Sequence, residues 1–259
     1  MVISDNGIPV RILREMKYIS DQRGIINRYY EESKGWNEHL QNSRSFVLDK
    51  IRQHRPEKVI ILGSGWLLDV PLEALLAACN RIYLADIHHP LQVQHKLKKI
   101  ENVRLISTDI SGGAVRQVYQ LVKQYRKEKV KRSLDTIALH SPELPEADYC
   151  VSLNLLNQLD IMLVDYIKRY ISYSEDELTG FRKRIQEHHL SFLRPGASCF
   201  ITDVKEIIIN RRKQVKREKS LVHVELPEGR HTKSWTWKFD RKEYNPGFDT
   251  HLEVIAVEL

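Results

Sequence analysis

The stretch Lys58-Val-Ile-Ile-Leu-Gly-Ser-Gly-Trp-Leu-Leu-Asp69 decides how the rest of the chain is organised. Its apolar run enters Gly63-Ser64-Gly65 and leads toward a helix-compatible segment, residues 70–79. Such a run before a glycine turn is typical of a buried parallel strand. Glycine lets a ligand approach the backbone closely, and the N–H groups at a helix start favour polar or anionic ligand atoms. The stretch therefore predicts a nucleotide-binding loop.

A second apolar run, residues 81–86, ends in an acidic side chain. Asp86 follows the glycine turn by about 20 residues. At that spacing a carboxylate lies at the carboxyl end of the neighbouring strand, where it can accept hydrogen bonds from both hydroxyls of a ribose. The strand, turn, helix, strand and acid together favour a site for a cofactor that contains a nucleoside.

Length and composition allow one large α/β core. The chain has 259 residues, 42% of them hydrophobic, which suits one domain with a small extension. We expect a helical extension or cap over residues 1–54 and the main domain over residues 55–259. The start of the chain has no signal-peptide pattern, and no apolar run reaches the ~20 residues that span a bilayer. We therefore expect a soluble, cytoplasmic protein that does not associate with membranes.

The cysteines and histidines form no pattern typical of a metal site. Cys79, Cys150 and Cys199 are widely spaced without a Cys-x-x-Cys motif, so we expect buried free thiols. The pairs His88-His89 and His188-His189 have no third ligand at a suitable spacing. We expect a polar loop at the first pair and a packed or surface helix at the second.

The formal net charge of +7 is compatible with an anionic partner such as RNA, although scattered basic residues are usually solvated. The basic run 211–219 is the densest cluster. It would be either the solvated face of a helix or loop, or an anion-binding surface.

The first 54 residues have the apolar spacing of two or three amphipathic helices, broken near Ser20-Asp21 and near residues 33–35. Aromatic and hydrogen-bonding residues concentrate in segment 27–39. This segment would either cap a cofactor and shape a substrate pocket, or simply pack the extension onto the core. The candidate substrate residues in it are Tyr29, Tyr30, Trp36 and His39.

Polar side chains also follow the third and fourth predicted strands. The third, residues 103–109, ends in Asp109, which would share one crevice with Asp86 because the carboxyl ends of parallel strands meet there. The fourth strand leads to Asn154, Asn157 and Gln158. These amides would bind polar substrate groups or a cofactor amine, or would serve only turns and helix capping.

The remaining segments complete an alternating order of strands and helices. A capped helix over residues 174–192 precedes a fifth strand, residues 197–204. Residues 234–239 and 252–259 alternate in polarity and predict an antiparallel pair at the edge of the sheet.

This order resembles the class I S-adenosylmethionine-dependent methyltransferases over residues 55–259. The turn Leu193-Arg-Pro-Gly196 is similar to one that often precedes the fifth strand of that family. The resemblance implies a Rossmann-like, doubly wound, mostly parallel seven-stranded sheet with a C-terminal antiparallel pair and an N-terminal helical extension. It also implies S-adenosylmethionine as cofactor. Carried over by position, Gly63, Ser64 and Gly65 lie under its methionine part, Asp86 holds the ribose, Asp109 and Ile110 contact the adenine, and Asn154 and Leu155 line the methyl-transfer site. Ile87, next to Asp86, is a further candidate cofactor-binding residue.

Two positions depart from the family pattern. Ile61 stands where many members have an acid that binds the cofactor's ammonium group, and Leu67 stands where many have a third glycine. Asp69 would either replace the missing acid or be structural.

The leading hypothesis is an enzyme that transfers a methyl group to a small or medium-sized acceptor. Its catalysis would consist mainly of alignment and exclusion of water. His39, Tyr30 and His140 are candidates for a general base. The alternatives are an RNA methyltransferase that uses the basic segments, and a non-catalytic Rossmann-like scaffold.

Overall fold

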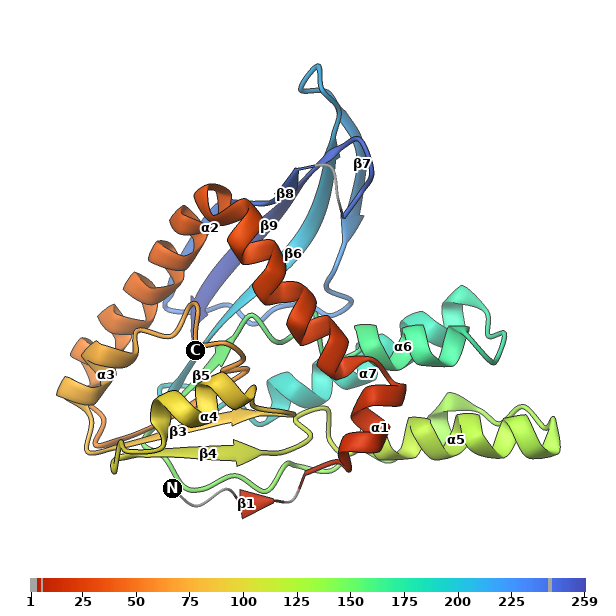
Figure 1. The fold of residues 1–259 in the computed structure, drawn as a ribbon, viewed down its shortest axis with the longest axis horizontal. Helices are drawn as coiled ribbons and strands as arrows, with labels where there is room; N and C mark the ends of the chain where they lie inside the picture. The colour runs from red at the N-terminus through yellow and green to blue at the C-terminus, as the bar shows by residue number, and fades with distance from the viewer. Residues whose placement is uncertain (1–3, 6, 242–243) are drawn as a thin grey trace.

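One sheet forms the centre of the molecule (Figure 1). The computed structural model describes residues 4–5, 7–241 and 244–259. Within them the sheet has nine strands, in the order β1-β4-β3-β2-β5-β6-β9-β8, and β7 pairs with β6 off this path. The strands are β1 Ser4–Asp5, β2 Lys58–Leu62, β3 Arg81–Asp86, β4 Val103–Ser107, β5 Tyr149–Leu153, β6 Ser198–Ile209, β7 Val215–Ser220, β8 His231–Arg241 and β9 Asp249–Glu258.

The pairing confirms the predicted fold class. Strands β1 to β6 pair in parallel with their neighbours, whereas β9 is antiparallel to β6 and β8 is antiparallel to β9. The seven strands from β4 to β8 in this order form the doubly wound, Rossmann-like sheet that the resemblance to class I methyltransferases implies. Strands β1 and β7 are additions to it.

The sequence suggested a helix or a loop for the basic run 211–219. The structure instead shows a strand in most of it. It contains most of β7, which pairs antiparallel with residues 205–209 of β6 and is exposed along its whole length. The reason is that β6 extends well beyond its pairing with β5, which ends at Ile201. The backbone groups of this longer part need other partners, and β7 supplies them on one edge.

Helices cover both faces of the sheet. They are α1 Val10–Glu15, α2 Tyr18–His54, α3 Leu72–Ala78, α4 Leu91–Leu97, α5 Ala114–Glu128, α6 Ile161–Lys168 and α7 Glu175–Ser191, with a short 3-10 helix at Leu134–Thr136. Apolar residues of α1, α5, α6 and α7 form one core cluster, and those of α2, α3 and α4 form the other. Alternate residues of β2 enter the two clusters, as expected for a strand that is buried on both faces.

The N-terminal helices break slightly before the predicted positions, at Lys17 and at Glu32. The chain turns at Lys17, which has a φ of 72°, and α2 then continues to His54. The expected second break is a kink at Glu32 within α2, and Figure 1 shows α2 as two arms that meet at an angle. The Glu32 carboxylate accepts hydrogen bonds from the backbone N–H and Nε of Arg241, so β8 holds the kink in place.

The division at residue 54 stays a prediction. Residues 1–3 and 6 of the predicted extension lie outside the described residues. Helix α2 packs against β8 and contributes to the core beside α3. Among the described residues, no helix is both long and apolar enough to cross a membrane.

Candidate functional site

A cavity of about 300 Å³ lies at the carboxyl ends of the parallel strands and beneath the first arm of α2. It opens where β2 stands between β3 and β5, so the chain winds outward in opposite directions from this point. Open α/β sheets bind ligands at such a switch point. The volume is within the range of small-molecule sites.

The glycine turn after β2 is built by close backbone contact. Gly63 has a φ of +84°, and a Cβ at this position would lie 2.6 Å from the carbonyl oxygen of Leu153. Only glycine fits there without movement of β5. The turn is also fixed to β3, because the N–H groups of Gly63 and Ser64 donate to the carbonyl of Ala85 at 2.9 and 3.3 Å.

The N–H groups of the turn are bonded within the protein. The N–H of Gly65 donates to Asp86 Oδ2 at 2.8 Å, and α3 begins only at Leu72 and has seven residues. The turn instead offers the buried hydroxyl of Ser64, whose Oγ has no hydrogen-bond partner among the described residues.

Leu67 adopts the conformation that glycine would have there. Its φ is 62°, in the left-handed region that costs a non-glycine residue about 1–2 kcal/mol. Strain of this kind is often found at ligand-binding loops.

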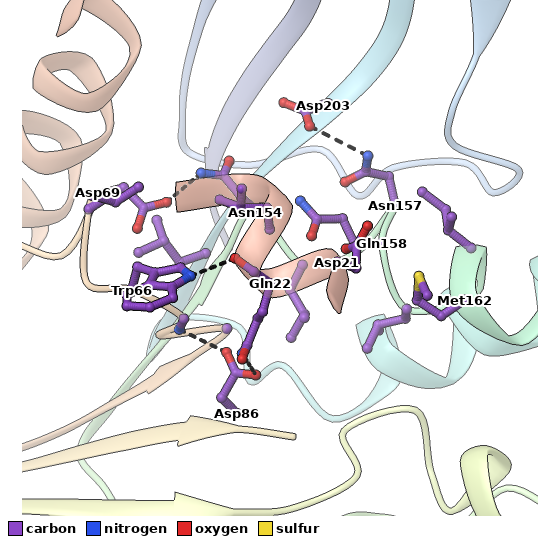
Figure 2. Close-up of a pocket in the computed structure, with 18 of the residues that line it drawn as sticks. Asp21, Gln22, Trp66, Asp69, Asp86, Asn154, Asn157, Gln158, Met162 and Asp203 are labelled. Carbon is purple, nitrogen blue, oxygen red and sulfur yellow. Dashed lines mark hydrogen bonds between the residues drawn. The ribbon is translucent and has the colours of Figure 1, made fainter. Parts of the chain in front are cut away.

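Asp86 lines the cavity, and its carboxylate can accept further hydrogen bonds. Apart from the bond to Gly65, the carboxylate has only a long contact, 3.5 Å, from Gln22 Nε2 to Oδ1. Figure 2 shows the Gln22 side chain reaching down from α2 toward Asp86. The side-chain amide of Gln22 also forms hydrogen bonds with the backbone carbonyl and the ring of His88. The backbone carbonyl of Gln22 accepts from Trp66 Nε1. These bonds fasten α2 across the cavity.

Asp109 also lines the cavity, but its carboxylate is largely committed to the start of α5. One oxygen accepts from the backbone and hydroxyl of Ser111, and the other accepts from the N–H of Val115. Burial raises the pKa of Asp109, and these bonds partly oppose the rise. The neighbouring Ile110 offers a buried apolar surface.

A chain of hydrogen bonds links α2, the turn and β5. Asn154, which follows β5 with a φ of 47°, donates from Nδ2 to Asp69 Oδ2 at 2.6 Å (Figure 2). Burial raises the pKa of Asp69 to about 6. The carbonyl Oδ1 of Asn154 is buried and has no partner among the described residues, so the site contains an amide acceptor that is ready for a ligand donor.

His39 lies in the cavity wall with both ring nitrogens next to polar neighbours. Its ring stacks on Trp237 with centroids 3.8 Å apart, and its Nδ1 accepts from Trp235 Nε1 at 3.1 Å. Its Nε2 lies 3.3 Å from Nδ2 of Asn154. Burial lowers the pKa of His39 to about 3. His39 is therefore unsuited to be the general base, because its buried ring takes up a proton poorly.

The far side of the cavity combines acids and aromatic rings. Asp203 on β6 is 2% exposed, and its Oδ2 receives only a 3.5 Å contact from Asn157 Nδ2. Burial, with a contribution from the charge of Asp69, raises the pKa of Asp203 to about 7. The rings of Trp36, Trp237, Phe239 and Tyr244 line the same side.

The structure brings together most of the predicted residues. The cavity lining includes the predicted cofactor residues Gly63, Ser64, Gly65, Asp86, Ile87, Asp109, Ile110, Asn154 and Leu155 and the predicted substrate residues Trp36, His39, Asn157 and Gln158. Their roles stay predictions.

Three predicted residues lie elsewhere. Tyr29 and Tyr30 are not in the cavity lining: Tyr29 packs on Trp36, and Tyr30 is 73% exposed. The helical repeat places Tyr30 off the stripe of Tyr18, Gln22 and Ile25 that faces the cavity, whereas Tyr29 continues that stripe and packs on Trp36 instead. His140 is exposed and outside the lining, and its carbonyl accepts from His188.

Sequence reasoning missed the contribution of β6 and β8. Asp203 and Glu206 lie within β6, beyond the point where its pairing with β5 ends at Ile201. Trp237 and Phe239 enter the cavity only because β8 and α2 pack together, and no local pattern reveals that contact. Among the described residues, no three His, Cys, Asp or Glu side chains are arranged to hold a metal ion.

Comparisons with known proteins give a likeness to solved structures only. No protein-family model and no curated protein matches the chain. One matching structure is the N-methyltransferase NodS from Bradyrhizobium japonicum, at 11% identity, with 87% of this chain and 98% of that chain covered and a TM-score of 0.41. Another is 1,6-didemethyltoxoflavin-N1-methyltransferase from Burkholderia thailandensis, at 12% identity, with 100% and 94% covered and a TM-score of 0.40. The identities and TM-scores are low, so these likenesses carry no argument about the function of the cavity.

Proposed function

We propose that the protein is an S-adenosylmethionine-dependent methyltransferase that acts on a small or medium-sized acceptor. The observation that carries the proposal is Asp86, an acid with open acceptor capacity at the carboxyl end of β3, beside the tight glycine turn of β2. A ribose binds at this position in Rossmann-like sheets.

The charge of the cavity supports a cationic ligand. Its lining contains six acidic residues and one arginine, although the whole chain has a net charge of +7. The acidic residues are Asp21, Asp69, Asp86, Asp109, Asp203 and Glu206. S-adenosylmethionine carries a sulfonium and an ammonium group, so an acidic cavity suits it electrostatically.

The residues present fit the cofactor part by part. Asp86 would accept from the ribose hydroxyls, and Ile87 and Ile110 would flank the adenine. Asp69 and the unpartnered Asn154 Oδ1 would receive the ammonium group in place of the family acid, since Ile61 is fully buried in the core.

When bound, the cofactor supplies an activated methyl group on sulfur. The protein's part is to hold an acceptor at the other side of Asn154 and Leu155, to exclude water and to orient the nucleophile. Helix α2 would exclude water, because Gln22 and Trp66 fasten it over the cavity.

The substitution Asp86→Ala tests the central contact. We expect binding of S-adenosylhomocysteine to weaken by at least tenfold, because two charge-assisted hydrogen bonds of about 1.5–3 kcal/mol each are lost. Calorimetric titration measures the affinity. Asp176→Asn, at an exposed position in the first turn of α7, is the control. Unchanged affinity in a folded Asp86→Ala protein would refute the ribose role.

An RNA acceptor is the second candidate, favoured by the exposure of β7. The side chains of Arg211, Arg212, Lys216 and Lys219 in this hairpin are exposed, and Figure 1 shows β7 and the end of β6 projecting from the sheet. RNA bound there would dissociate steeply with salt. A protein that binds no cofactor would instead be a scaffold.

A further inference from the structure

We infer that the methyl acceptor is an amine, whose nitrogen lies against the Asp203 carboxylate, and that Asp203 takes up the proton that this nitrogen must lose. The inference rests on the proposed function, because it assigns the acceptor side of the same cavity. It concerns Asp203 and the aromatic residues, which the cofactor contacts proposed above do not use.

Asp203 is well separated from the proposed ribose position. Strand β6 is three steps from β3 in the order β3-β2-β5-β6, or about 14 Å at the usual strand spacing. The register places Ala85 level with Phe200, so Asp203 also lies further along the strand direction than Asp86. Figure 2 shows Asp86 and Asp203 at opposite ends, with Asn154, Asn157 and Gln158 between them.

Asp203 has no cationic partner among the described residues. Its Oδ1 is buried without a hydrogen bond, and no lysine, arginine or histidine forms an ion pair with it. The nearby basic groups are engaged elsewhere, since Arg28 pairs with Asp240 and Arg217 pairs with Glu206. An ionised carboxylate in such a place is costly unless a cation compensates it. An ammonium group of a ligand would supply that cation.

The aromatic residues that line the same cavity suit an organic amine. Trp36 and Trp237 lie edge to face with centroids 4.7 Å apart, and Phe239 packs on both. Such rings bind the apolar body of a ligand, and Arg28 already lies over Phe239 as a cation. The buried Trp237 Nε1 has no partner among the described residues.

The charge of Asp203 disfavours other acceptors. A carboxylate or phosphate acceptor would be repelled by Asp203, whose charge no neighbouring cation compensates among the described residues. A neutral hydroxyl would leave the charge of Asp203 uncompensated.

The proton step balances without a further reactant. The amine enters as an ammonium ion, one N–H bond breaks, and an O–H bond forms on Asp203. The electron pair stays on nitrogen, which becomes the nucleophile for the sulfonium methyl donor. A carboxylate and an ammonium thus become a carboxylic acid and an amine. A pKa of about 7 for Asp203 is suited to this exchange.

Three probes of similar shape test the inference. Phenethylamine, 2-phenylethanol and phenylacetate are titrated calorimetrically into protein saturated with S-adenosylhomocysteine. We expect phenethylamine to bind at least tenfold more tightly than the other two. The isosteric Asp203→Asn should reduce its affinity at least tenfold and remove the preference, whereas Asp176→Asn should change neither.

The outcomes separate this inference from the proposed function. Intact binding of S-adenosylhomocysteine by Asp203→Asn shows that the variant is folded and that only the acceptor side has changed. A preference for the alcohol or acid, an amine preference that survives Asp203→Asn, or no amine binding by cofactor-loaded protein would overturn the inference. If wild-type protein binds no S-adenosylhomocysteine, the proposed function fails, and the amine titration of the unloaded protein still decides the role of Asp203.

Discussion

The ionised carboxylate of Asp203 lowers the free energy of unfolding, and its surroundings do not compensate for this loss. Its pKa in the folded state, about 7, is above the unfolded value of about 3.9, so the folded state binds the proton more tightly. The stabilisation is present at low pH and is lost as pH rises through 7. The groups that influence its pKa are Asn157, whose hydrogen bond opposes the rise, and Asp69, whose charge adds to it.

We therefore predict that Asp203→Asn stabilises the protein in a pH-dependent manner. The gain in free energy of unfolding should be about 2 kcal/mol larger at pH 8 than at pH 5. Urea unfolding at the two pH values measures it, with Asp176→Asn for comparison. An equal effect at both pH values would show that Asp203 does not titrate in this range. A residue that destabilises the fold but is needed for binding is typical of a functional site.

Residues on strands were easier to predict than residues on α2. Asp86 and Asn154 could be placed in one crevice because the carboxyl ends of parallel strands converge. Tyr29 and Tyr30 were misplaced because the phase of α2 relative to the cavity depends on the turn at Lys17 and the kink at Glu32. Neither feature has a proline or a helix-capping motif that would mark it in the sequence.

At the scale of elements, α2 can cover the cavity only because it lies very close to β8. A Cβ on Gly35 would be 2.5 Å from the carbonyl oxygen of Lys238, whereas a Cβ on Gly24 of the same helix would meet nothing within 4 Å. The sequence predicted helix here but not this contact, since the close approach is visible only once β8 is in place.

These two glycines provide a matched pair of substitutions. Gly35→Ala should destabilise the protein by about 2 kcal/mol, as overpacking does, and should weaken cofactor binding because α2 shifts. Gly24→Ala should stabilise it by about 0.5–1 kcal/mol through helix propensity. Thermal unfolding of both variants tests the prediction, which fails if the two substitutions have effects of the same sign.

At the scale of the whole molecule, the basic hairpin of β6 and β7 meets the acidic cavity at the ion pair of Arg217 with Glu206. The order of the sheet was predictable, because short right-handed crossovers leave few topologies. The hairpin was not, because pairing of β7 depends on the unusual length of β6.

The exposed tip of the hairpin does not line the cavity, so we predict that its basic side chains are dispensable for a small acceptor. Replacing Arg211, Arg212 and Lys216 together with serine should leave binding of S-adenosylhomocysteine and of phenethylamine unchanged within twofold, by calorimetry. If the same replacement abolished methyl transfer to RNA, and RNA affinity fell steeply with salt, the acceptor would be RNA instead.

The most direct test of the central claim is a calorimetric titration of the wild-type protein with S-adenosylmethionine and S-adenosylhomocysteine, with NAD as the control ligand. The account predicts saturable binding of both sulfur nucleotides, one molecule for each chain, and no binding of NAD. Binding of NAD alone, or of none of the three by protein shown to be folded, would contradict it.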